Sequence, residues 1–517
     1  MISAFRQIFR DTGPEAISRK PLAMIGVSLA VFALSLILGT WNNSFPYYYH
    51  LDEPLEVWMV IHGTTNFHHP LLMGNTTDLV TWLLGVGNEP QTVVELGRWC
   101  IAIFGAVASV AFAWVGYRYA GLAGGLASGV FVAMHPLLVE VAHYYKEDPA
   151  LLMGVGLSFL AVTRFWDNPS RGNAAALGVA NALAFSGKYI GIVMAALSIA
   201  VLILARPRPG RVICCFLYTA LFVVAVGIIN YQLVAGAGQG FHGIGREVAL
   251  LGTGGKHAFL NEKYVGVFYK NSNFLILIFA GWYVLRLVLQ PKERVFPEYL
   301  IAAFPLAFAL MISLTPKTAE RYFLPVSATV CLLAGIGLAD LCRHFFLLRT
   351  WLPRRRRILY SALLAGTCVL FASPVVDCLM GFGIDTRKQL AHWIEKNVPP
   401  DAVIVQDRRV QLVAVSGKSM EQRSFSVPQQ VLSNQYAADF GSVSELQSQG
   451  ILYIALMVGQ KYRNHPSARV KSREEFDNFV REVTETGTLL WKSESRTPQI
   501  VNPRLELYRL PEPDRID

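Results

Sequence analysis

The sequence predicts a polytopic α-helical membrane protein with a small C-terminal α/β domain. Hydrophobic residues make up 53% of the 517 residues and charged residues only 16%, against about 25% charged residues in a typical soluble chain. The mean hydropathy is +0.38. Long apolar stretches fill the chain before Gly383, and a mixed polar pattern follows it. These observations exclude an ordinary soluble enzyme, a disordered chain and a disulfide-rich secreted scaffold.

The apolar stretches predict the membrane-spanning helices, because hydrocarbon offers no partner for unpaired backbone amides. About eleven stretches approach the roughly 20 residues that a helix needs to cross a bilayer. If the residues around Ser186–Tyr189 belonged to one helix instead of two short ones, the total would be even. The expected limits are Pro21–Thr40, Glu95–Tyr117, Leu122–Ala142, Ala150–Phe165, Ala174–Ser186, Ile190–Leu204, Val212–Val234, Ser272–Leu289, Glu298–Leu314, Phe323–Cys342 and Ile358–Phe382.

The distribution of basic residues decides between these counts, because lysine and arginine gather in cytoplasmic loops. With a cytoplasmic N-terminus and eleven spans, most basic residues before Gly383 lie inside, including the run Arg354–Arg357. Met1–Lys20 lacks the short apolar core of a signal peptide, so we expect a cytoplasmic lead-in. The net charge of +10 therefore reflects membrane topology, and no nucleic-acid partner is expected.

Two domains follow from this pattern. Residues 1–382 form the transmembrane domain, whose first large outer loop covers residues 41–94, and residues 383–517 form a soluble extracytoplasmic domain. In the latter we expect helices at Thr386–Asn397 and Ser472–Thr486, together with strands at 402–406, 452–457 and 505–508. No nucleotide-binding glycine loop occurs in this domain, so we expect it to pack or to guide an acceptor.

Two acidic motifs at predicted outer helix ends are candidates for chemistry. The first outer loop contains Asp52-Glu53 after a tyrosine run, and the third span is followed by Glu147-Asp148. Adjacent carboxylates repel one another and are costly to desolvate, which favours a functional use over a merely solvated loop. Because both pairs lie on one predicted side, they can converge. Such carboxylates can act as a general base, orient an acceptor or hold a divalent cation.

Basic residues on the same predicted side suit a phosphate group. Lys188 lies at a tight outer turn, and Lys317 and Arg321 lie in the segment before the tenth span. An arginine offers a bidentate grip and a lysine a point charge; the alternative is that these residues only end helices at the membrane interface. The histidines of the first loop, such as His68-His69, lack the spacing of a helical zinc pair.

The order of these motifs resembles the C-type membrane glycosyltransferases over nearly the whole chain. It comprises an N-terminal span followed by Asp52-Glu53, a second acidic motif at Glu147-Asp148-Pro149, Ser186-Gly-Lys-Tyr189, the run from Lys317 to Pro325, and Asp385-Thr-Arg opening a C-terminal domain. The bacterial branch with enzymes like protein O-mannosyltransferase, aminoarabinose transferase and galacturonosyl transferase is the most similar. The resemblance implies a multi-pass enzyme of the bacterial inner membrane.

The resemblance also implies roles for individual residues. Asp52 would be the general base that deprotonates the acceptor, with Glu53 beside it, and Asp148 with Glu147 would orient the acceptor or support the base. Cations would offset charge on the departing lipid phosphate. The expected substrate-binding set is Lys188, Lys317, Arg321, Tyr322, His50, Tyr49 and Lys146.

The expected reaction moves a sugar, with inversion, from a polyprenyl-phosphate donor to an envelope lipid, glycan or protein at the outer face of the membrane. No cofactor is expected to be required, although a divalent cation is compatible with the acidic motifs. The expected partners are the donor lipid, the acceptor and membrane lipids. The rival reading is a transporter or flippase of lipid-linked or envelope substrates, which usually places ionisable residues on broken helices near the membrane midplane. A non-catalytic assembly subunit is a third reading.

Overall fold

The chain forms two compact units. The computed structural model describes residues 21–50, 52–65, 67–205, 210–236, 245, 262–314, 319–344, 353–412, 427–460, 462, 468–494, 498 and 500–512. The first unit comprises the chain up to Tyr47 together with Asp52–Val376. The second comprises Tyr48–Leu51 and Asp377–Asp517. A short segment of the first outer loop thus belongs with the C-terminal residues.

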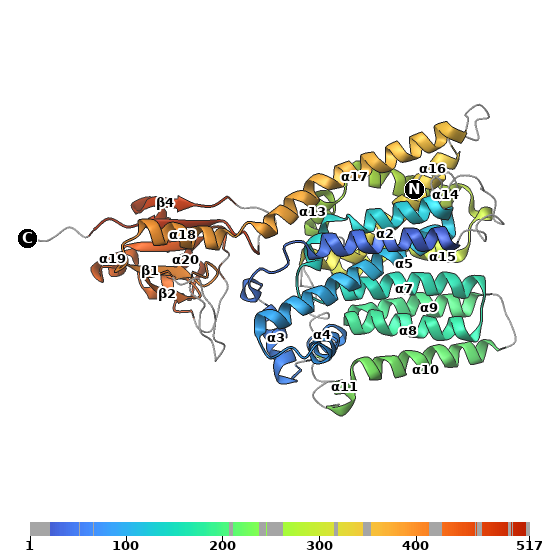
Figure 1. Cartoon of the computed structure of the whole chain (residues 1–517), viewed down its shortest axis with the longest axis horizontal. Coiled ribbons are helices and arrows are strands. Elements are labelled where there is room, and N and C mark those ends of the chain that lie inside the picture. Colours follow the sequence, from blue (N-terminus) through green and yellow to red (C-terminus); the bar gives the residue numbers. More distant parts are fainter. Residues whose placement is uncertain are drawn as a thin grey trace, which may run out of the picture. The chain divides into compact units, whose positions relative to one another are not determined.

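The first unit is a bundle of helices (Figure 1). α5 packs against α2, α7 and α16, and α8 packs against α7 and α10. The helices are α2 (Pro21–Thr40), α3 (Glu53–His62), α4 (Leu72–Leu83), α5 (Pro90–Ala133), α6 (Pro136–Ala142), α7 (Asp148–Asp167), α8 (Arg171–Gly187), α9 (Val193–Leu204), α10 (Arg211–Ile229), α11 (Tyr231–Ala235), α13 (Glu262–Asn271), α14 (Phe274–Leu289), α15 (Phe296–Ser313), α16 (Leu324–His344) and α17 (Pro353–Gly383), with 3₁₀ turns at Tyr189–Ile192, Pro291–Glu293 and Glu320–Phe323.

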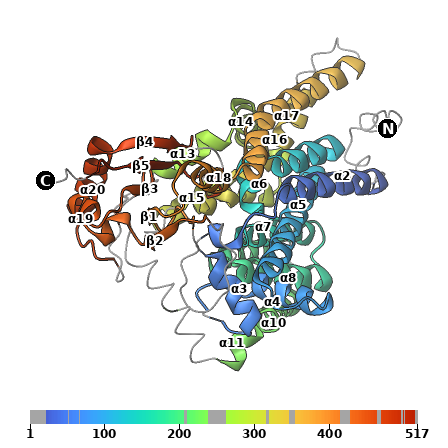
Figure 2. The ribbon, with the colours of Figure 1, turned by 60° about the vertical axis from the view of Figure 1, so that its left-hand side comes forward.

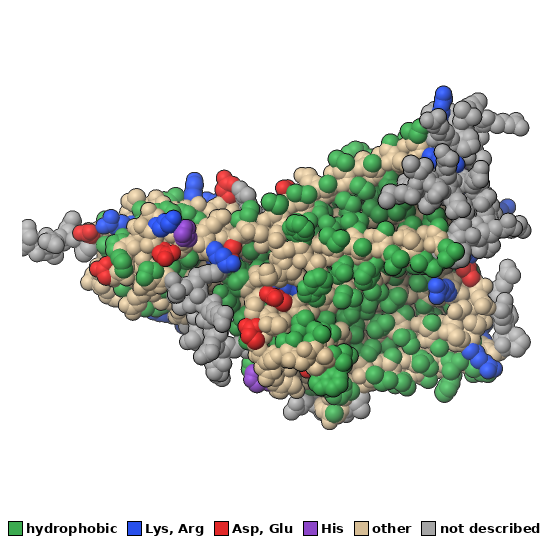
Figure 3. Space-filling view, viewed as in Figure 1, with side chains coloured by type: hydrophobic (Ala, Val, Ile, Leu, Met, Phe, Trp, Pro, Cys, Tyr) green, Lys and Arg blue, Asp and Glu red, His purple; other side chains and the backbone are tan. Residues whose placement is uncertain are grey.

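In the described part of the chain, seven helices are long and apolar enough to cross a membrane, or eight if the bent pair α13 and α14 forms one span. The chain is thus a multi-pass membrane protein. Figure 3 shows hydrophobic side chains covering the visible face of the helical unit. The sequence count of eleven is higher because α5 contains one predicted span and the first part of the next, and because α8 and α9 have only 17 and 12 residues. All eleven predicted stretches nevertheless lie mostly on helices.

A reversal at Gly121 divides α5 into two halves. The first contains the predicted span Glu95–Tyr117, and the second begins the predicted span Leu122–Ala142, which is interrupted at Met134–His135 and continues in α6. Gly121 has φ 69° and ψ −165°, a backbone conformation that residues with a Cβ rarely adopt. The two halves then lie against each other, since a Cβ on Gly125 would come within 3.0 Å of the Ala113 carbonyl oxygen and a Cβ on Gly129 within 2.8 Å of the Ala113 Cβ. Small residues allow this close approach of two helices, as is common within membranes.

The second unit is a five-stranded sheet with helices on both faces (Figure 2). Its strand order is β2-β1-β3-β5-β4; β1 pairs in parallel with β2 and β3, whereas β5 pairs antiparallel with β3 and β4. The elements are α18 (Thr386–Asn397), β1 (Val403–Asp407), β2 (Gln430–Asn434), α19 (Val443–Ser448), β3 (Tyr453–Met457), α20 (Arg473–Thr486), β4 (Thr488–Lys492) and β5 (Leu505–Arg509).

Alternation along the strands divides the core of this unit between the two faces of the sheet. Ile404 on β1 packs with Leu390 and Ile394 of α18. The next residue, Val405, packs on the other face with Phe476 of α20. The small α/β fold predicted from the sequence is confirmed, including both helices and three of the strands, whereas β2 and β4 were not predicted.

Candidate functional site

A cluster of ion pairs lies where the ends of several helices of the first unit meet. Asp52 precedes α3, and its side chain does not cap that helix. Instead, its Oδ2 lies 3.0 Å from Lys146 Nζ and 3.5 Å from Arg321 Nη2. The Asp52 side chain is 45% exposed, whereas those of Glu147 and Asp148 are each 2% exposed. Asp52 is therefore the carboxylate that a substrate reaches most easily.

Glu53 points away from this cluster into the interior. Its oxygens accept hydrogen bonds from Arg98 Nε at 3.1 Å and Nη2 at 2.6 Å, and from the backbone N–H of Tyr145 at 2.7 Å. The Arg98 guanidinium also donates to the carbonyl oxygens of Asn43 and Phe45. Neither Glu53 nor Arg98 is exposed. The structure thus gives Glu53 the contacts of a structural residue that fixes α3 against α5.

Lys146 lies at the centre of the cluster and connects both acidic motifs. Its side chain is 1% exposed, and its Nζ lies 3.0 Å from Asp52, 3.7 Å from Glu56 and 3.7 Å from Glu147. Burial alone favours the neutral amine, but Coulombic attraction from Glu147, Glu56 and Asp52 outweighs it and raises the pKa of Lys146 above its usual value. Lys146 is therefore a fixed positive charge next to Asp52.

Two further cations hold the second acidic motif. Lys188 Nζ lies 2.7 Å from Asp148 Oδ1 and 3.1 Å from Glu147 Oε1. Arg321 Nε lies 3.2 Å from Asp148 Oδ2, so Arg321 is shared between Asp52 and Asp148. Both cations also approach the face of the Tyr322 ring, with Lys188 Nζ at 4.3 Å and Arg321 Cζ at 5.6 Å from its centroid. The structure thus brings together six of the predicted site residues and the ring of Tyr322.

The glycine of the Ser186-Gly-Lys-Tyr189 motif explains why Lys188 reaches Asp148. Gly187 is the last residue of α8, and a Cβ there would lie 2.6 Å from the backbone nitrogen of Leu151 and 2.7 Å from the carbonyl carbon of Ala150. Only a residue without a side chain allows the end of α8 to touch the first turn of α7. Asp148 is the first residue of α7, and Lys188 directly follows Gly187. The contact between the two helices therefore places Lys188 beside Asp148.

The charges and the burial around the cluster shift the pKa values of its carboxyl groups in opposite directions. Burial favours the protonated form of Glu147, but Lys188, His69, Lys146 and Arg321 hold its pKa well below its usual range. Burial raises the pKa of Glu56 to about 7, although Lys146 acts in the opposite direction. Glu147 therefore stays ionised, and Glu56 changes protonation near neutral pH.

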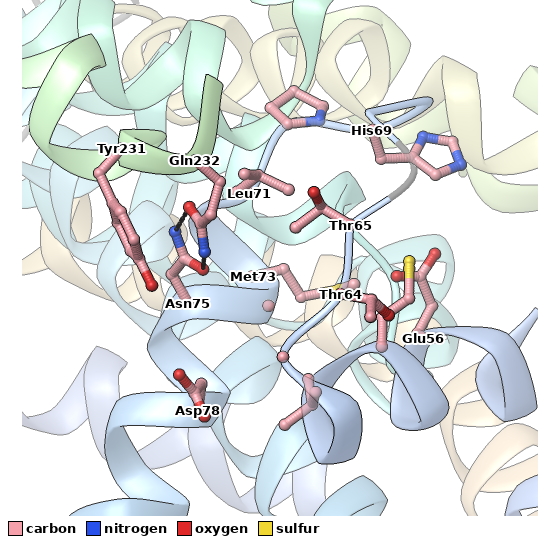
Figure 4. A pocket seen from close by; sticks show the side chains of 15 residues that line it. Glu56, Thr64, Thr65, His69, Leu71, Met73, Asn75, Asp78, Tyr231 and Gln232 are labelled. Atoms are coloured by element: carbon pink, nitrogen blue, oxygen red, sulfur yellow. Dashed lines mark hydrogen bonds between the residues drawn. The ribbon is translucent and has the colours of Figure 1, made fainter. Parts of the chain in front are cut away.

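A pocket of about 70 Å³ borders the cluster (Figure 4). Glu56 and His69 line it and also contact the cluster, since His69 Nδ1 lies 3.3 Å from Glu147 Oε1. On its other side, Asn75 and Gln232 exchange two hydrogen bonds of 2.9 and 2.7 Å, which join α4 to α11. The pocket therefore offers hydrogen-bonding groups close to the ion pairs.

Besides Glu53, three predicted site residues do not belong to this cluster as the structure describes it. Tyr49 and His50 are buried and belong to the second unit. Lys317 lies outside the described residues. By contrast, sequence reasoning did not assign Glu56, His69 and Arg98 to the site. Glu56 could have been found, because it follows Asp52 by four residues and so shares its helix face.

The sequence leaves open whether the acidic motifs hold a divalent cation. Within the ranges that the structure describes, no group of three or more His, Cys, Asp or Glu side chains is arranged to hold a metal ion. The carboxylates that could serve as ligands, Asp52, Glu147 and Asp148, each lie within 3.5 Å of at least one lysine, arginine or histidine nitrogen. Protein cations thus already neutralise much of their charge.

The fold and the site define a multi-pass membrane protein with an ion-paired acidic cluster at its helix ends. No protein-family model and no curated protein matches the chain. Among solved structures, it is similar to ArnT from Cupriavidus metallidurans bound to undecaprenyl phosphate, with 15% identity, a TM-score of 0.46, and coverage of 94% of this chain and 97% of that one.

Two further solved structures are similar to the chain. The oligosaccharyltransferase AglB from Archaeoglobus fulgidus, in complex with an inhibitory peptide and a dolichol-phosphate, shares 12% identity with a TM-score of 0.47, and the similarity covers 84% of this chain and 69% of that one. The S. cerevisiae protein O-mannosyltransferase Pmt1-Pmt2 complex shares 16% identity with a TM-score of 0.35, over 44% and 35%.

Proposed function

We propose that this protein is an inverting glycosyltransferase that moves a sugar from a polyprenyl-phosphate donor to an acceptor at the extracytoplasmic face of the membrane. The observation that carries the proposal is the shared position of Arg321, 3.5 Å from Asp52 and 3.2 Å from Asp148. It combines an exposed carboxylate, which can take a proton, with a cation that can face a phosphate. Both are needed for glycosyl transfer from a lipid phosphate.

In the proposed reaction, Asp52 takes the proton from an acceptor hydroxyl or amine. The acceptor atom forms a bond to the anomeric carbon of the sugar while the bond from that carbon to the phosphate oxygen breaks. This direct displacement inverts the anomeric configuration, and the lipid phosphate leaves with the bonding electrons. Lys188 and Arg321 offset the charge that develops on this phosphate, and Asp148 holds both cations in place beforehand.

Replacing Arg321 by alanine is expected to raise the KM for the lipid donor by about 10- to 100-fold. Hydrogen bonds to charged groups contribute about 1.5–3 kcal/mol, and a factor of ten corresponds to about 1.4 kcal/mol. Steady-state kinetics with varied donor concentration would measure the change. Arg118→Ala serves as the matched control, because Arg118 forms an exposed pair with Asp167 at the other end of α7. Unchanged donor kinetics in Arg321→Ala would discard the phosphate contact.

We further propose that the reaction needs no divalent cation, because Lys146, Lys188 and Arg321 already supply positive charge to the site. Treatment of the purified protein with a chelator is expected to leave the initial rate of transfer within about two-fold of the untreated rate, since no charge in the site is removed. A steep loss of activity that Mg²⁺ or Mn²⁺ restores would contradict this part of the proposal.

The sugar and the acceptor can be identified together by mass spectrometry of a deletion strain. Loss of one sugar from an envelope lipid, glycan or protein, restored by the wild-type gene and not by the Asp52→Asn variant, is the expected result. A transporter or flippase would instead redistribute a lipid-linked substrate between the two leaflets, and the purified protein would transfer no sugar. Transfer by purified protein in detergent, where no compartments exist, separates these two functions.

A further inference from the structure

Glu56 is a buried carboxylate that shares a cation with the proposed base. It lies in the first turn of α3, four residues after Asp52, so the two side chains are neighbours on one face of the helix. Lys146 Nζ lies 3.0 Å from Asp52 Oδ2 and 3.7 Å from Glu56 Oε1. The Asp52 side chain is 45% exposed and that of Glu56 is 7% exposed. One ammonium group thus interacts with an exposed and a buried carboxylate.

The proposed transfer step does not use Glu56, although a buried carboxylate is costly. An ionised carboxylate away from water is unfavourable unless cations and hydrogen bonds compensate for the lost hydration. Burial raises the pKa of Glu56 to about 7; Lys146 acts in the opposite direction, and repulsion by Glu147 and Asp52 adds to the rise. Glu56 therefore exists in both protonation states around neutral pH.

The charged and titratable groups around Glu56 come from several parts of the chain. They are Asp52 before α3, Tyr145, Lys146 and Glu147 between α6 and α7, and His69 and Asp78 in the lining of the pocket in Figure 4. Among the described residues, Lys146 is the cation that forms an ion pair with Glu56. A change in the charge of Glu56 is therefore felt first by Lys146, and Lys146 also contacts Asp52.

The charge of Glu56 changes how strongly Asp52 attracts a proton. When Glu56 is ionised, it competes with Asp52 for the Lys146 ammonium group, and its negative charge opposes a second negative charge on Asp52. When Glu56 is protonated, both effects disappear. Because the charge of Asp52 raises the pKa of Glu56, the charge of Glu56 favours the protonated form of Asp52 by the same free energy.

We propose that Glu56 sets the proton affinity of Asp52 through Lys146, so that ionised Glu56 makes Asp52 the stronger base. This inference rests on the proposed function, because it assumes that Asp52 takes the proton from the acceptor. No bond is made or broken at Glu56 in the transfer step. Glu56 acts through Lys146 and is therefore a positioning residue. The inference gives a part in the reaction to a buried carboxylate that the displacement itself leaves unused.

The pH dependence of sugar transfer tests the inference. In the wild-type protein, kcat is expected to rise about 3- to 10-fold from about pH 6 to about pH 8 as Glu56 ionises, because a stronger base accelerates proton transfer. Glu56→Gln has nearly the same shape but stays uncharged, so its kcat is expected to match the wild type at the lower pH and to lack this rise. The KM for the lipid donor is expected to stay within about two-fold.

Three further variants show whether the charge of Glu56 causes the rise. Glu56→Asp restores a carboxylate and is expected to restore the rise in kcat. Asp167→Asn is the matched control, because it removes a carboxylate of the same unit that pairs with Arg118, and it is expected to keep the rise. Histidine also changes charge in this pH range, so His69→Gln is tested as well. Loss of the rise in His69→Gln together with its retention in Glu56→Gln would overturn the inference.

Infrared difference spectroscopy gives a readout that does not depend on activity. It follows the protonation of carboxyl groups, and the Asp52 signal is identified by its absence in Asp52→Asn. Asp52 is expected to lose its proton at a lower pH in Glu56→Gln than in the wild-type protein. An unchanged titration of Asp52, or a wild-type pH profile of kcat in Glu56→Gln, would contradict the inference. If the wild-type protein transfers no sugar, the proposed function fails, and the titration still decides whether Glu56 governs the proton affinity of Asp52.

Discussion

Asp52→Asn is expected to lower kcat by about 10²- to 10⁴-fold, which is the usual contribution of a general base. Asparagine has nearly the shape of aspartate and still accepts hydrogen bonds from Lys146 and Arg321, but it cannot take a proton. The KM for the donor should therefore change much less than kcat. Initial rates of sugar transfer by the purified variant, at saturating donor and acceptor, would measure the effect.

Asp167→Asn is the control for this experiment. Asp167 is also a partly exposed carboxylate of the first unit and pairs with an arginine, but it ends α7 far along the helix from Asp148. Its replacement is expected to leave kcat unchanged. If Asp52→Asn retained near-normal turnover while folded, Asp52 would be removed from the role of base, and the more buried carboxylates of the cluster would have to be considered.

The second large effect is expected for stability. Arg98→Met leaves the Glu53 carboxylate buried without its ion pair, and breaking a buried pair in this way costs about 3–5 kcal/mol. The side chain also holds the loop before α3, because it donates to the carbonyl oxygens of Asn43 and Phe45 and lies 3.6 Å from the centroid of the Phe45 ring. Unfolding of the detergent-purified protein, followed by heat or denaturant, would measure the loss.

Two variants show whether the effect comes from the unpaired charge. Combining Arg98→Met with Glu53→Gln is expected to recover part of the lost stability, because no ionised group then remains buried. Arg118→Met, which breaks a pair whose side chains are 41% and 33% exposed, is expected to cost less than about 1 kcal/mol. Equal losses for Arg98→Met and Arg118→Met would show that burial does not matter here.

Much of the fold could be predicted from local sequence. Apolar stretches of bilayer length mark helices wherever they occur, because every backbone amide must be paired in hydrocarbon. All eleven predicted stretches therefore lie mostly on helices, although Met134–His135 interrupts the stretch Leu122–Ala142 and Asn230 interrupts Val212–Val234. In the C-terminal unit, β2 and β4 escaped prediction. β2 consists of Gln430–Asn434, which carries three polar residues among five, and β4 lies at the edge of the sheet, where burial imposes little pattern.

The candidate site was harder to predict, because a linear sequence does not show which way neighbouring side chains point. Asp52 and Glu53 are adjacent and chemically similar, but successive residues of a helix are rotated by about 100°. One therefore faces the ion-pair cluster and the other faces Arg98. Tyr49 was assigned to the site by its nearness to Asp52 in sequence, whereas its ring and hydroxyl contact residues of the C-terminal unit.

The contact between Tyr49 and Asp385 spans 336 residues of chain, and this has a consequence for biosynthesis. At synthesis rates of about 5–20 residues per second, Asp385 emerges roughly 20–70 s after Tyr49. During that interval the membrane helices can already insert, but the residues before Asp52 have no partner to dock against. The C-terminal unit, which holds Tyr49, is thus expected to complete its fold only near the end of translation.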